Sequence, residues 1–305
     1  MTEAGVLVVD KTSGVTSFDA VALVRRRLGL KRVGHAGTLD PDATGVLPML
    51  LGEATKLMAY LADQDKEYVA TLRLGVTTDT GDLSGRVMAE TAVPEVDRQQ
   101  IELVCRPFVG RIKQVPPMYS AVHHEGRRLY ELAREGIEVV REPREVVIHA
   151  IEVQEVTLRA VRLRVVCGKG TYLRTLAADL GTALGCGAVV ERLVRTRVGP
   201  FTLADAVAWE ALAAEPAAAL WARVRPAESG LIDWPALRLD TRAMHRFEHG
   251  QSIEIAPARA AAGTFVRVHA VDGRLLGVGV VVDGNRTRPV RVLHADRPGT
   301  RVRPA

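Results

Sequence analysis

The chain has 305 residues, 47% of them hydrophobic and 25% charged, a composition typical of a folded protein rather than a disordered one. Its net charge of +5 favours a polyanionic partner, although only 6 of the 41 basic residues are Lys, so a coding bias towards Arg explains the charge equally well. Three cysteines without a C-x-x-C pair argue against a zinc site or a disulfide framework, and no 18-residue apolar run suggests secretion or a membrane span, so we expect a cytoplasmic protein.

The first third of the chain predicts short elements around one long loop. Thr16 and Ser17 can cap a helix that Gly29 ends, and the segment 31–45 holds three glycines and a proline, which exclude a regular element. Long loops of this kind are usually functional. In chain order we expect a strand at 6–9, a helix at 18–28, the loop at 31–45, an apolar run at 46–51, a helical pattern at 53–61, a half-buried strand at 68–74, a turn-rich loop at 76–87 and a helix at 97–106.

The remainder predicts a mixed α/β body followed by a β-rich module. An Ala/Pro-rich segment at 213–230 marks a boundary, so we expect one domain at 1–228 and a second at 229–305. Asp272-Gly273 and Asp283-Gly284 each lie between β-rich runs and predict hairpins. We further expect a short helix at 129–135, strands at 145–157 and 160–167, and helices at 172–184 and 203–214.

The stretch from Gly34 to Pro41, GHAGTLDP, is the most informative one. Its two glycines allow the backbone to approach a ligand, and Pro41 pushes Asp40 out of helical geometry so that the carboxylate can project from the loop. From spacing alone, a turn in which Asp40 caps a backbone amide is the better interpretation, because Asp-Pro is a common turn dipeptide.

Several motifs in sequence order change that balance. The chain resembles the TruB family of bacterial tRNA pseudouridine-55 synthases over residues 5 to 205. The matching motifs are DK with GVTS at 10–17, GHAGTLDP at 34–41, LGEATK at 51–56, DKEY at 65–68, TDTGDLSG at 78–85, QVPPMYSA at 114–121, YELAREG at 130–136, GKGTYLRTLAADLG at 168–181 and RTRVGPF at 195–201. The chain departs from the family pattern at Thr12, His123, Gly168 and Val189. These departures concern details of RNA binding rather than the reaction.

The resemblance implies a fold and a reaction. The fold is a mixed α/β (α+β) catalytic domain with a long, largely antiparallel sheet, a thumb-like insertion at about 110–145 and a small C-terminal PUA-like RNA-binding domain. The reaction converts uridine to pseudouridine with a carboxylate, which the resemblance assigns to Asp40. That carboxylate either adds to the base or the sugar carbon, or removes a sugar proton, and the sequence leaves these alternatives open.

Other residues receive roles only through the resemblance. Arg174 is expected to pair with Asp40 and keep it ionised. Tyr68 is expected to stack on the target base and to help remove the C5 proton late in the reaction. Tyr172 and Leu193 are expected to complete the base pocket, and His35 to fill the space left by the flipped nucleotide. Taken alone, Arg174 reads as a solvated charge, Leu193 as a core residue and His35 as a surface residue.

Phosphate contacts are predicted at four basic residues, each of which is singly an ordinary surface charge: Lys11, Lys56, Arg127 and Arg128. Two further patterns fail as sites. His245 and His249 have helical spacing but no third metal ligand, and Gly168-Lys169-Gly170 lacks the spacing of a phosphate-binding loop.

We therefore expect a monomeric enzyme that needs no cofactor, metal or protein partner and acts on uridine 55 in the T arm of tRNA. Two alternatives stay open. The chain could be the catalytic subunit of a guide-RNA particle, or a tRNA-binding folding chaperone whose catalysis is incidental.

Overall fold

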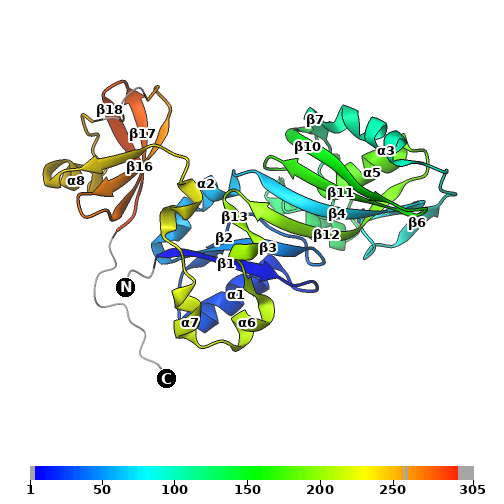
Figure 1. The fold of residues 1–305 in the computed structure, drawn as a ribbon, viewed down its shortest axis with the longest axis horizontal. Coiled ribbons are helices and arrows are strands. Elements are labelled where there is room, and N and C mark those ends of the chain that lie inside the picture. The colour runs from blue at the N-terminus through cyan, green and yellow to red at the C-terminus, as the bar shows by residue number, and fades with distance from the viewer. Residues whose placement is uncertain (1–3, 256, 258–259, 295–305) are drawn as a thin grey trace. The chain divides into compact units, whose positions relative to one another are not determined.

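The computed structural model describes residues 4–255, 257 and 260–294. The chain divides into two compact units (Figure 1). Unit 1 comprises residues 1–41, 46–62 and 199–305, and unit 2 comprises 42–45 and 63–198. The predicted domain boundary near residue 228 stays a prediction.

The first part of unit 1 is a small sheet covered by helices. Its strands are β1 (Gly5–Lys11), β2 (Val33–His35), β3 (Thr44–Leu51) and β14 (Val207–Ala208), and its helices are α1 (Ser17–Leu28), α6 (Trp209–Ala214) and α7 (Ala217–Ala222). β1 lies between β14 and β3, parallel to β14, and β2 pairs antiparallel with β3. The predicted helix at 18–28 is confirmed: Thr16 and Asp19 form a capping box, and Gly29 ends the helix at φ +65°. Apolar residues of α1 are buried against apolar residues of β1 and β3.

The second part of unit 1 is a four-stranded sheet with its own apolar core (Figure 1, orange to red). The strands, in spatial order, are β15 (Ala236–Leu239), β16 (Phe265–Ala270), β17 (Leu275–Asp283) and β18 (Arg286–Val292), and α8 (Thr241–Glu248) packs on them. β16, β17 and β18 are antiparallel. The hairpins predicted at Asp272-Gly273 and Asp283-Gly284 are confirmed: the first dipeptide lies between β16 and β17, and in the second Asp283 ends β17 and Gly284 begins the turn to β18.

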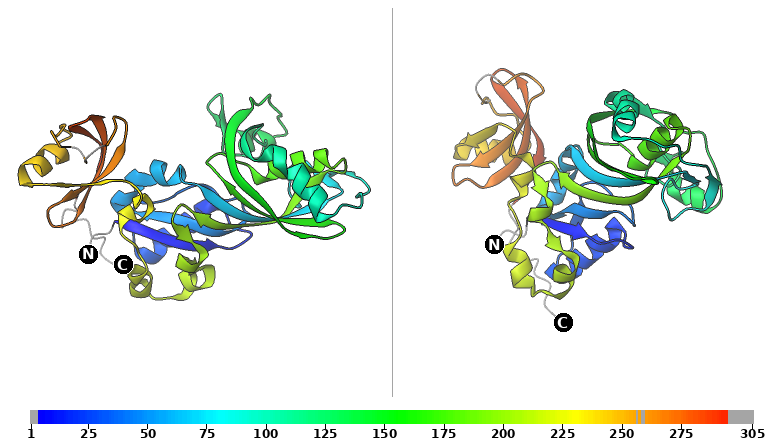
Figure 2. Two further views of the ribbon diagram at one scale, coloured as in Figure 1. Left: turned by 45° about the horizontal axis from the view of Figure 1, so that its top comes forward. Right: turned by 45° about the vertical axis from the view of Figure 1, so that its right-hand side comes forward.

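Unit 2 is built on an antiparallel sheet that carries two helices on one face (Figures 1 and 2). In spatial order its strands are β12 (Ala188–Val198), β4 (Lys66–Leu74), β11 (Ala160–Cys167), β10 (Arg144–Val156) and β7 (Gly110–Gln114); the helices are α3 (Arg98–Cys105) and α5 (Leu173–Ala183). Thr44 and Gly45 pair with β12 in parallel. Gly45 is required there, because its φ is +106° and a Cβ would lie 2.2 Å from the carbonyl oxygen of Arg195. The expected mixed, largely antiparallel α/β fold is confirmed.

The strand β4 shows how the sequence pattern produces this sheet. Its residues alternate between buried and half-buried from Lys66 to Leu74, as the period-2 pattern predicts. The smaller elements are η1 (Gly52–Leu57), α2 (Met58–Ala62), β5 (Val76–Thr78), β6 (Val87–Glu90), η2 (Arg106–Phe108), β8 (His123–His124), β9 (Arg127–Arg128), α4 (Leu129–Arg134), β13 (Phe201–Thr202), η3 (Leu203–Asp205) and η4 (Ala227–Leu231).

Two predicted helices need correction. The segment 53–61 begins as the 3-10 turn η1 and becomes α-helical only in α2. The prediction of one helix at 203–214 is wrong in its first half, because Asp205 folds back to accept hydrogen bonds from Thr202 and Val207 pairs with Val9 as a strand. Only the second half, α6, is α-helical. Tertiary pairing here overrides local propensity.

The three cysteines are buried and unpaired. Burial raises the pKa of the Cys105 and Cys167 thiols to about 11, which leaves very little reactive thiolate near neutral pH. We expect both thiols of the native chain to react with a disulfide reagent about 100-fold more slowly than a free thiol. Thiol titration before and after unfolding in guanidinium chloride checks this, and rapid titration of the native protein would contradict it.

Among the residues that the structure describes, no helix is both long enough and apolar enough to cross a membrane.

Candidate active site

The loop between β2 and β3 presents Asp40 on a rigid backbone. Gly37 adopts φ +100°, a conformation that an L side chain rarely tolerates. The hydroxyl of buried Ser17 accepts a hydrogen bond from the N–H of Leu39 at 2.9 Å and donates one to its carbonyl at 3.1 Å. The residue just before Asp40 is therefore fixed to the start of α1, while Asp40 itself is only half-buried.

Lys11 fixes the other side of Asp40. Its ammonium has no exposed surface and donates to the carbonyls of Thr12, Val15 and Pro41, each at 2.8 Å. The N–H of Gly14 also donates to the Pro41 carbonyl. An ammonium with three backbone carbonyl partners and no exposed surface is placed to hold the loop in shape, and the phosphate contact at Lys11 stays a prediction.

We expect Lys11→Met to lower the free energy of unfolding by about 3 kcal/mol, because it removes three charge-assisted hydrogen bonds and leaves the carbonyls of Thr12 and Val15 without the ammonium donor. Urea unfolding of the variant measures the loss. Lys31→Met, at an exposed lysine of the segment 31–45, is the control and should leave the midpoint unchanged. Equal midpoints for the two variants would contradict the assignment.

In unit 2, Tyr68 and Leu193 share one face of the sheet. Tyr68 lies opposite Arg195, and Leu193 lies opposite Ala70, in the antiparallel pairing of β4 with β12. Residues directly opposite in such a pair project from the same face. Tyr68 and Leu193 are each 8% exposed, on the face against which α5 packs. This placement is compatible with the predicted base pocket, and the stacking role of Tyr68 stays a prediction.

Two buried cations flank Tyr68 on this face. Arg195 is 1% exposed and Lys66, two residues before Tyr68, is 7% exposed. Burial, and then the charge of Arg195, lower the pKa of Lys66 to about 8. Neither residue stood out in the sequence, although Lys66 occurs in the DKEY motif and Arg195 in the RTRVGPF motif.

Tyr172 and Arg174 stand at the start of α5. The side-chain amide of Gln114, at the end of β7, accepts a hydrogen bond from the N–H of Tyr172 at 3.0 Å and donates to its carbonyl at 3.3 Å. Gln114 is 1% exposed, so this reciprocal pair ties β7 to the first turn of α5. Gln114 belongs to the QVPPMYSA motif, and only that motif could have indicated it.

Arg174 is not a solvated charge: it is 6% exposed and joins two loops. Its guanidinium donates to the carbonyl of Thr80 at 2.9 Å and to that of Tyr119 at 2.7 Å, and its Nε lies 3.9 Å from Asp82 Oδ2. The other oxygen of Asp82 accepts hydrogen bonds from the Thr80 and Ser84 hydroxyls, each at 2.6 Å. Asp82 was not predicted as a site residue; the polar motif TDTGDLSG at 78–85, which contains it, was the signal that could have indicated it.

Two further predicted residues, His35 and Lys56, lie in unit 1. His35 is half-buried and pairs with Met49 at the end of β2. Lys56 contacts Glu53 at 2.5 Å and donates to the Val292 carbonyl at 2.9 Å, so it links η1 to β18. Its phosphate contact stays a prediction.

Arg127 and Arg128 form the short strand β9 of an exposed hairpin. Arg127 pairs with Glu135 at 2.5 Å, and Arg128 is exposed at the start of α4. Glu125 and Gly126 turn the hairpin with positive φ angles of 50° and 86°. Both phosphate contacts stay predictions.

The predicted site residues thus form two groups. His35 ends β2 and Asp40 lies in the loop after it, both in unit 1. The other group, in the β4, β12 and α5 region of unit 2, comprises Tyr68, Tyr172, Arg174 and Leu193. The ion pair between Asp40 and Arg174 stays a prediction. Among the described residues, no cluster of three or more His, Cys, Asp or Glu side chains could hold a metal ion.

Comparison with known families and proteins accounts for nearly the whole chain. The N-terminal domain of TruB family pseudouridylate synthases matches residues 25–173. A tRNA pseudouridylate synthase B C-terminal domain matches 174–232, and a TruB C-terminal domain of pseudouridine synthase II matches 235–293. A protein of Chromohalobacter salexigens named tRNA pseudouridine synthase B is 45% identical over 95% of this chain and 94% of its own length. The chain belongs to the TruB family.

Other relatives agree with this assignment. A TruB protein of Dechloromonas aromatica is 46% identical over 95% of both chains and is also named tRNA pseudouridine synthase B. Among solved structures, the chain is similar to one in a Cbf5-Nop10-Gar1 complex, with a TM-score of 0.73, 28% identity and coverage of 97% of this chain and 84% of the other. The resemblance inferred from the motifs is therefore confirmed.

Proposed function

We propose that this TruB family chain is a tRNA pseudouridine synthase that isomerises uridine 55 in the T arm of tRNA, with Asp40 as the central catalytic group. The observation that carries the proposal is the identity of 44–46% over 92% or more of this chain to proteins named tRNA pseudouridine synthase B. The rigid presentation of Asp40 between two anchored neighbours, Leu39 and Pro41, agrees with a catalytic role.

The reaction needs a carboxylate more than any other group. The C–N glycosidic bond of uridine breaks, the base turns, and a C–C bond forms at the same sugar carbon, so the atoms of substrate and product are the same. An ionised Asp40 can add to the base or the sugar carbon, or remove a sugar proton. Arg174 favours the ionised form if the two side chains meet, and Tyr68 offers its ring to the flipped base. Extracting that base from the RNA costs a few kcal/mol.

We further propose that the chain acts as a cytoplasmic monomer without a protein partner, and that its module at 229–305 contacts tRNA. Similarity to a chain in an H/ACA RNP bound to a substrate RNA, at 26% identity and a TM-score of 0.71, keeps a guide-RNA function as a second candidate. The identity to proteins named tRNA pseudouridine synthase B is much higher, which favours the guide-independent function.

One assay tests this proposal. The purified chain is incubated with an unmodified tRNA transcript, without guide RNA or cofactor, and pseudouridine is mapped chemically along the product. Pseudouridine at position 55 is the expected result. Product only after addition of a guide RNA would favour the second candidate, and product outside the T arm would refute the substrate assignment.

A further inference from the structure

The sheet of unit 2 has a second face, which α3 and α5 do not cover. We call this the open face. In β4 it consists of the half-buried residues that alternate with Tyr68 and Ala70. Its members, from the cross-strand pairing, are Glu67, Val69, Thr71 and Arg73 of β4, Arg192 and Val194 of β12, Ala160, Arg162 and Arg164 of β11, and Glu152 and Glu155 of β10.

Arginines at both ends of the open face are neutralised by neighbouring carboxylates. Arg73 pairs with Glu191 at 2.9 Å. Arg164 pairs with Glu67 at 2.7 Å and with Glu152 at 3.2 Å. In these ion pairs the positive charge of each arginine is balanced by a neighbouring carboxylate, as expected for a charged sheet surface in solvent.

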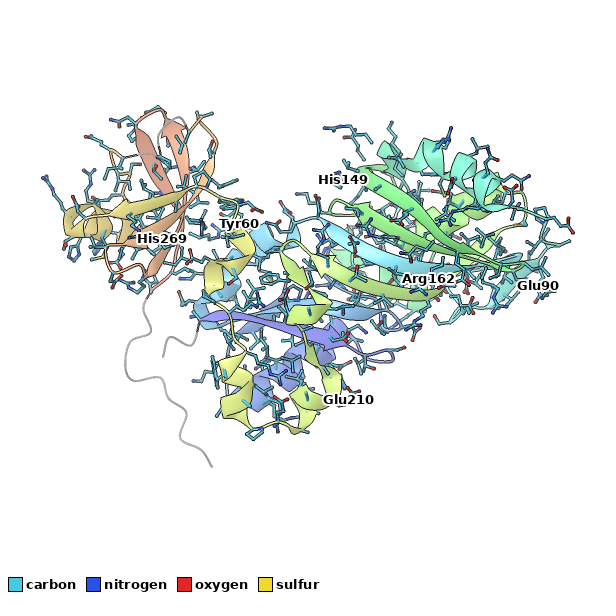
Figure 3. The ribbon with its side chains drawn as sticks, viewed as in Figure 1. Tyr60, Glu90, His149, Arg162, Glu210 and His269 are labelled. Atoms are coloured by element: carbon cyan, nitrogen blue, oxygen red, sulfur yellow. The ribbon has the colours of Figure 1, made fainter. Side chains whose placement is uncertain are left out.

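The centre of the open face lacks the ion pairs found at its ends. Thr71 lies directly opposite Arg192 on one side and Arg162 on the other, and Glu155 stands opposite Arg162 on the next strand (Figure 3 labels Arg162). Within the part of the chain that the structure describes, none of these four side chains has a hydrogen bond or an ion pair. Both arginines are exposed. Two unneutralised cations therefore flank a hydroxyl on adjacent strands.

This row lines a hollow of ≈ 520 Å³, together with Thr157, Ala160 and Glu191. The volume falls within the range of small-ligand sites, of several hundred Å³. Because neighbouring strands lie about 4.8 Å apart, the two arginine backbones are about 10 Å apart, and both guanidinium groups can reach a group seated over Thr71.

We propose that the open face binds the sugar–phosphate backbone of tRNA, with one phosphate held over Thr71 between Arg162 and Arg192. Guanidinium groups bind phosphate oxygens in a bidentate manner, and the Thr71 hydroxyl adds a donor. Glu191 is committed to Arg73, and Glu155 can accept a hydrogen bond from a ribose hydroxyl beside the phosphate. The chain's net charge of +5 favours such a polyanion.

This contact is separate from catalysis. Tyr68 projects from the other face of β4, so the open face meets a segment of RNA other than the uridine that Tyr68 would stack on. The inference rests on the proposed function only in taking tRNA as the substrate, and not on the role of Asp40.

The test is direct binding of the full chain to an unmodified tRNA transcript, measured by fluorescence anisotropy at several salt concentrations. We expect the double substitution Arg162→Ala/Arg192→Ala to raise the Kd about tenfold and to reduce the slope of log affinity against log salt by about one, because one phosphate contact is lost. Arg162→Lys/Arg192→Lys should recover part of the affinity, since it keeps the charge and loses the bidentate geometry.

The matched control is Arg98→Ala/Arg111→Ala, which removes the same charge from two exposed, ion-paired arginines of α3 and β7. It should leave the Kd within about twofold. An equal loss of tRNA affinity in both double variants would overturn the proposal, because it would show that binding depends only on the net charge of the chain.

Two other results would also overturn it. One is unchanged tRNA binding by Arg162→Ala/Arg192→Ala, with loss of binding to polyglutamate, which would indicate an acidic protein partner. The other is unchanged tRNA binding with loss of binding to free uridine monophosphate, which would indicate a small nucleotide. All these readouts are binding measurements, so a failure of Asp40 as the catalytic group would leave them interpretable.

Discussion

Asp40→Asn is expected to lower the rate of pseudouridine formation by about 10³-fold or more while changing the Kd for tRNA by no more than about twofold. The amide has nearly the shape of the carboxylate, but it is neither a nucleophile nor a base. Its neighbours Leu39 and Pro41 are held through their backbones by Ser17 and Lys11, and these two anchors of the loop do not involve the Asp40 carboxylate. Single-turnover measurement of product, with filter binding of tRNA, separates chemistry from binding.

Asp42→Asn is the matched control for this prediction. Asp42 is an exposed carboxylate two residues further along the same loop, and its variant should retain wild-type turnover. Pseudouridine formation by Asp40→Asn at a wild-type rate would refute the catalytic assignment. A loss of tRNA affinity equal to the loss of rate would instead show that Asp40 serves binding.

The regular elements followed from the sequence wherever the pattern agreed with the local caps. The helix at 18–28 has both a capping box and a terminating glycine, and β4 has strict alternation; both were predicted within a residue or two. The segment 203–214 shows the opposite case. Nothing local indicated that Val207 would pair with Val9, because that contact joins residues about 200 positions apart in the chain.

For the candidate site, the residue types were predictable and most of their partners were not. Motif order alone singled out Asp40, Tyr68 and Arg174. One of the three carbonyls around Lys11 belongs to Pro41, 30 residues away in the chain. A lysine that the sequence predicts at the surface is therefore buried and joins two segments of backbone. Only the assembled fold shows such a role, because a backbone carbonyl has no signature in the sequence.

The open face illustrates the same limit from the other side. Arg73, Arg162, Arg164 and Arg192 all look alike in the sequence, as polar positions of alternating strands. Register decides which of them forms an ion pair: Arg73 and Arg164 do, whereas Arg162 and Arg192 flank Thr71. Function at this surface therefore depends on cross-strand pairing that no local pattern specifies.

Arg174→Lys is expected to lower the maximal rate about 100-fold and to reduce the free energy of unfolding by about 2 kcal/mol. The guanidinium uses separate N–H groups for the carbonyls of Thr80 and Tyr119 while its Nε faces Asp82, and a single ammonium cannot keep all three positions. Both loops then lose their common anchor at the start of α5. Urea unfolding measures the stability, and single-turnover kinetics at saturating tRNA measure the rate.

Comparison with Arg98→Lys separates geometry from charge, because this exposed arginine of α3 makes one surface ion pair with Glu102 and should tolerate lysine with no change in rate or stability. The rates of Arg174→Lys are compared at a temperature where the variant is fully folded, so that lower stability cannot mimic lower activity. A folded Arg174→Lys enzyme with wild-type turnover would show that positive charge suffices at this position. The planar fork of Arg174, and with it the anchoring of the loops at Thr80 and Tyr119, would then have no part in catalysis.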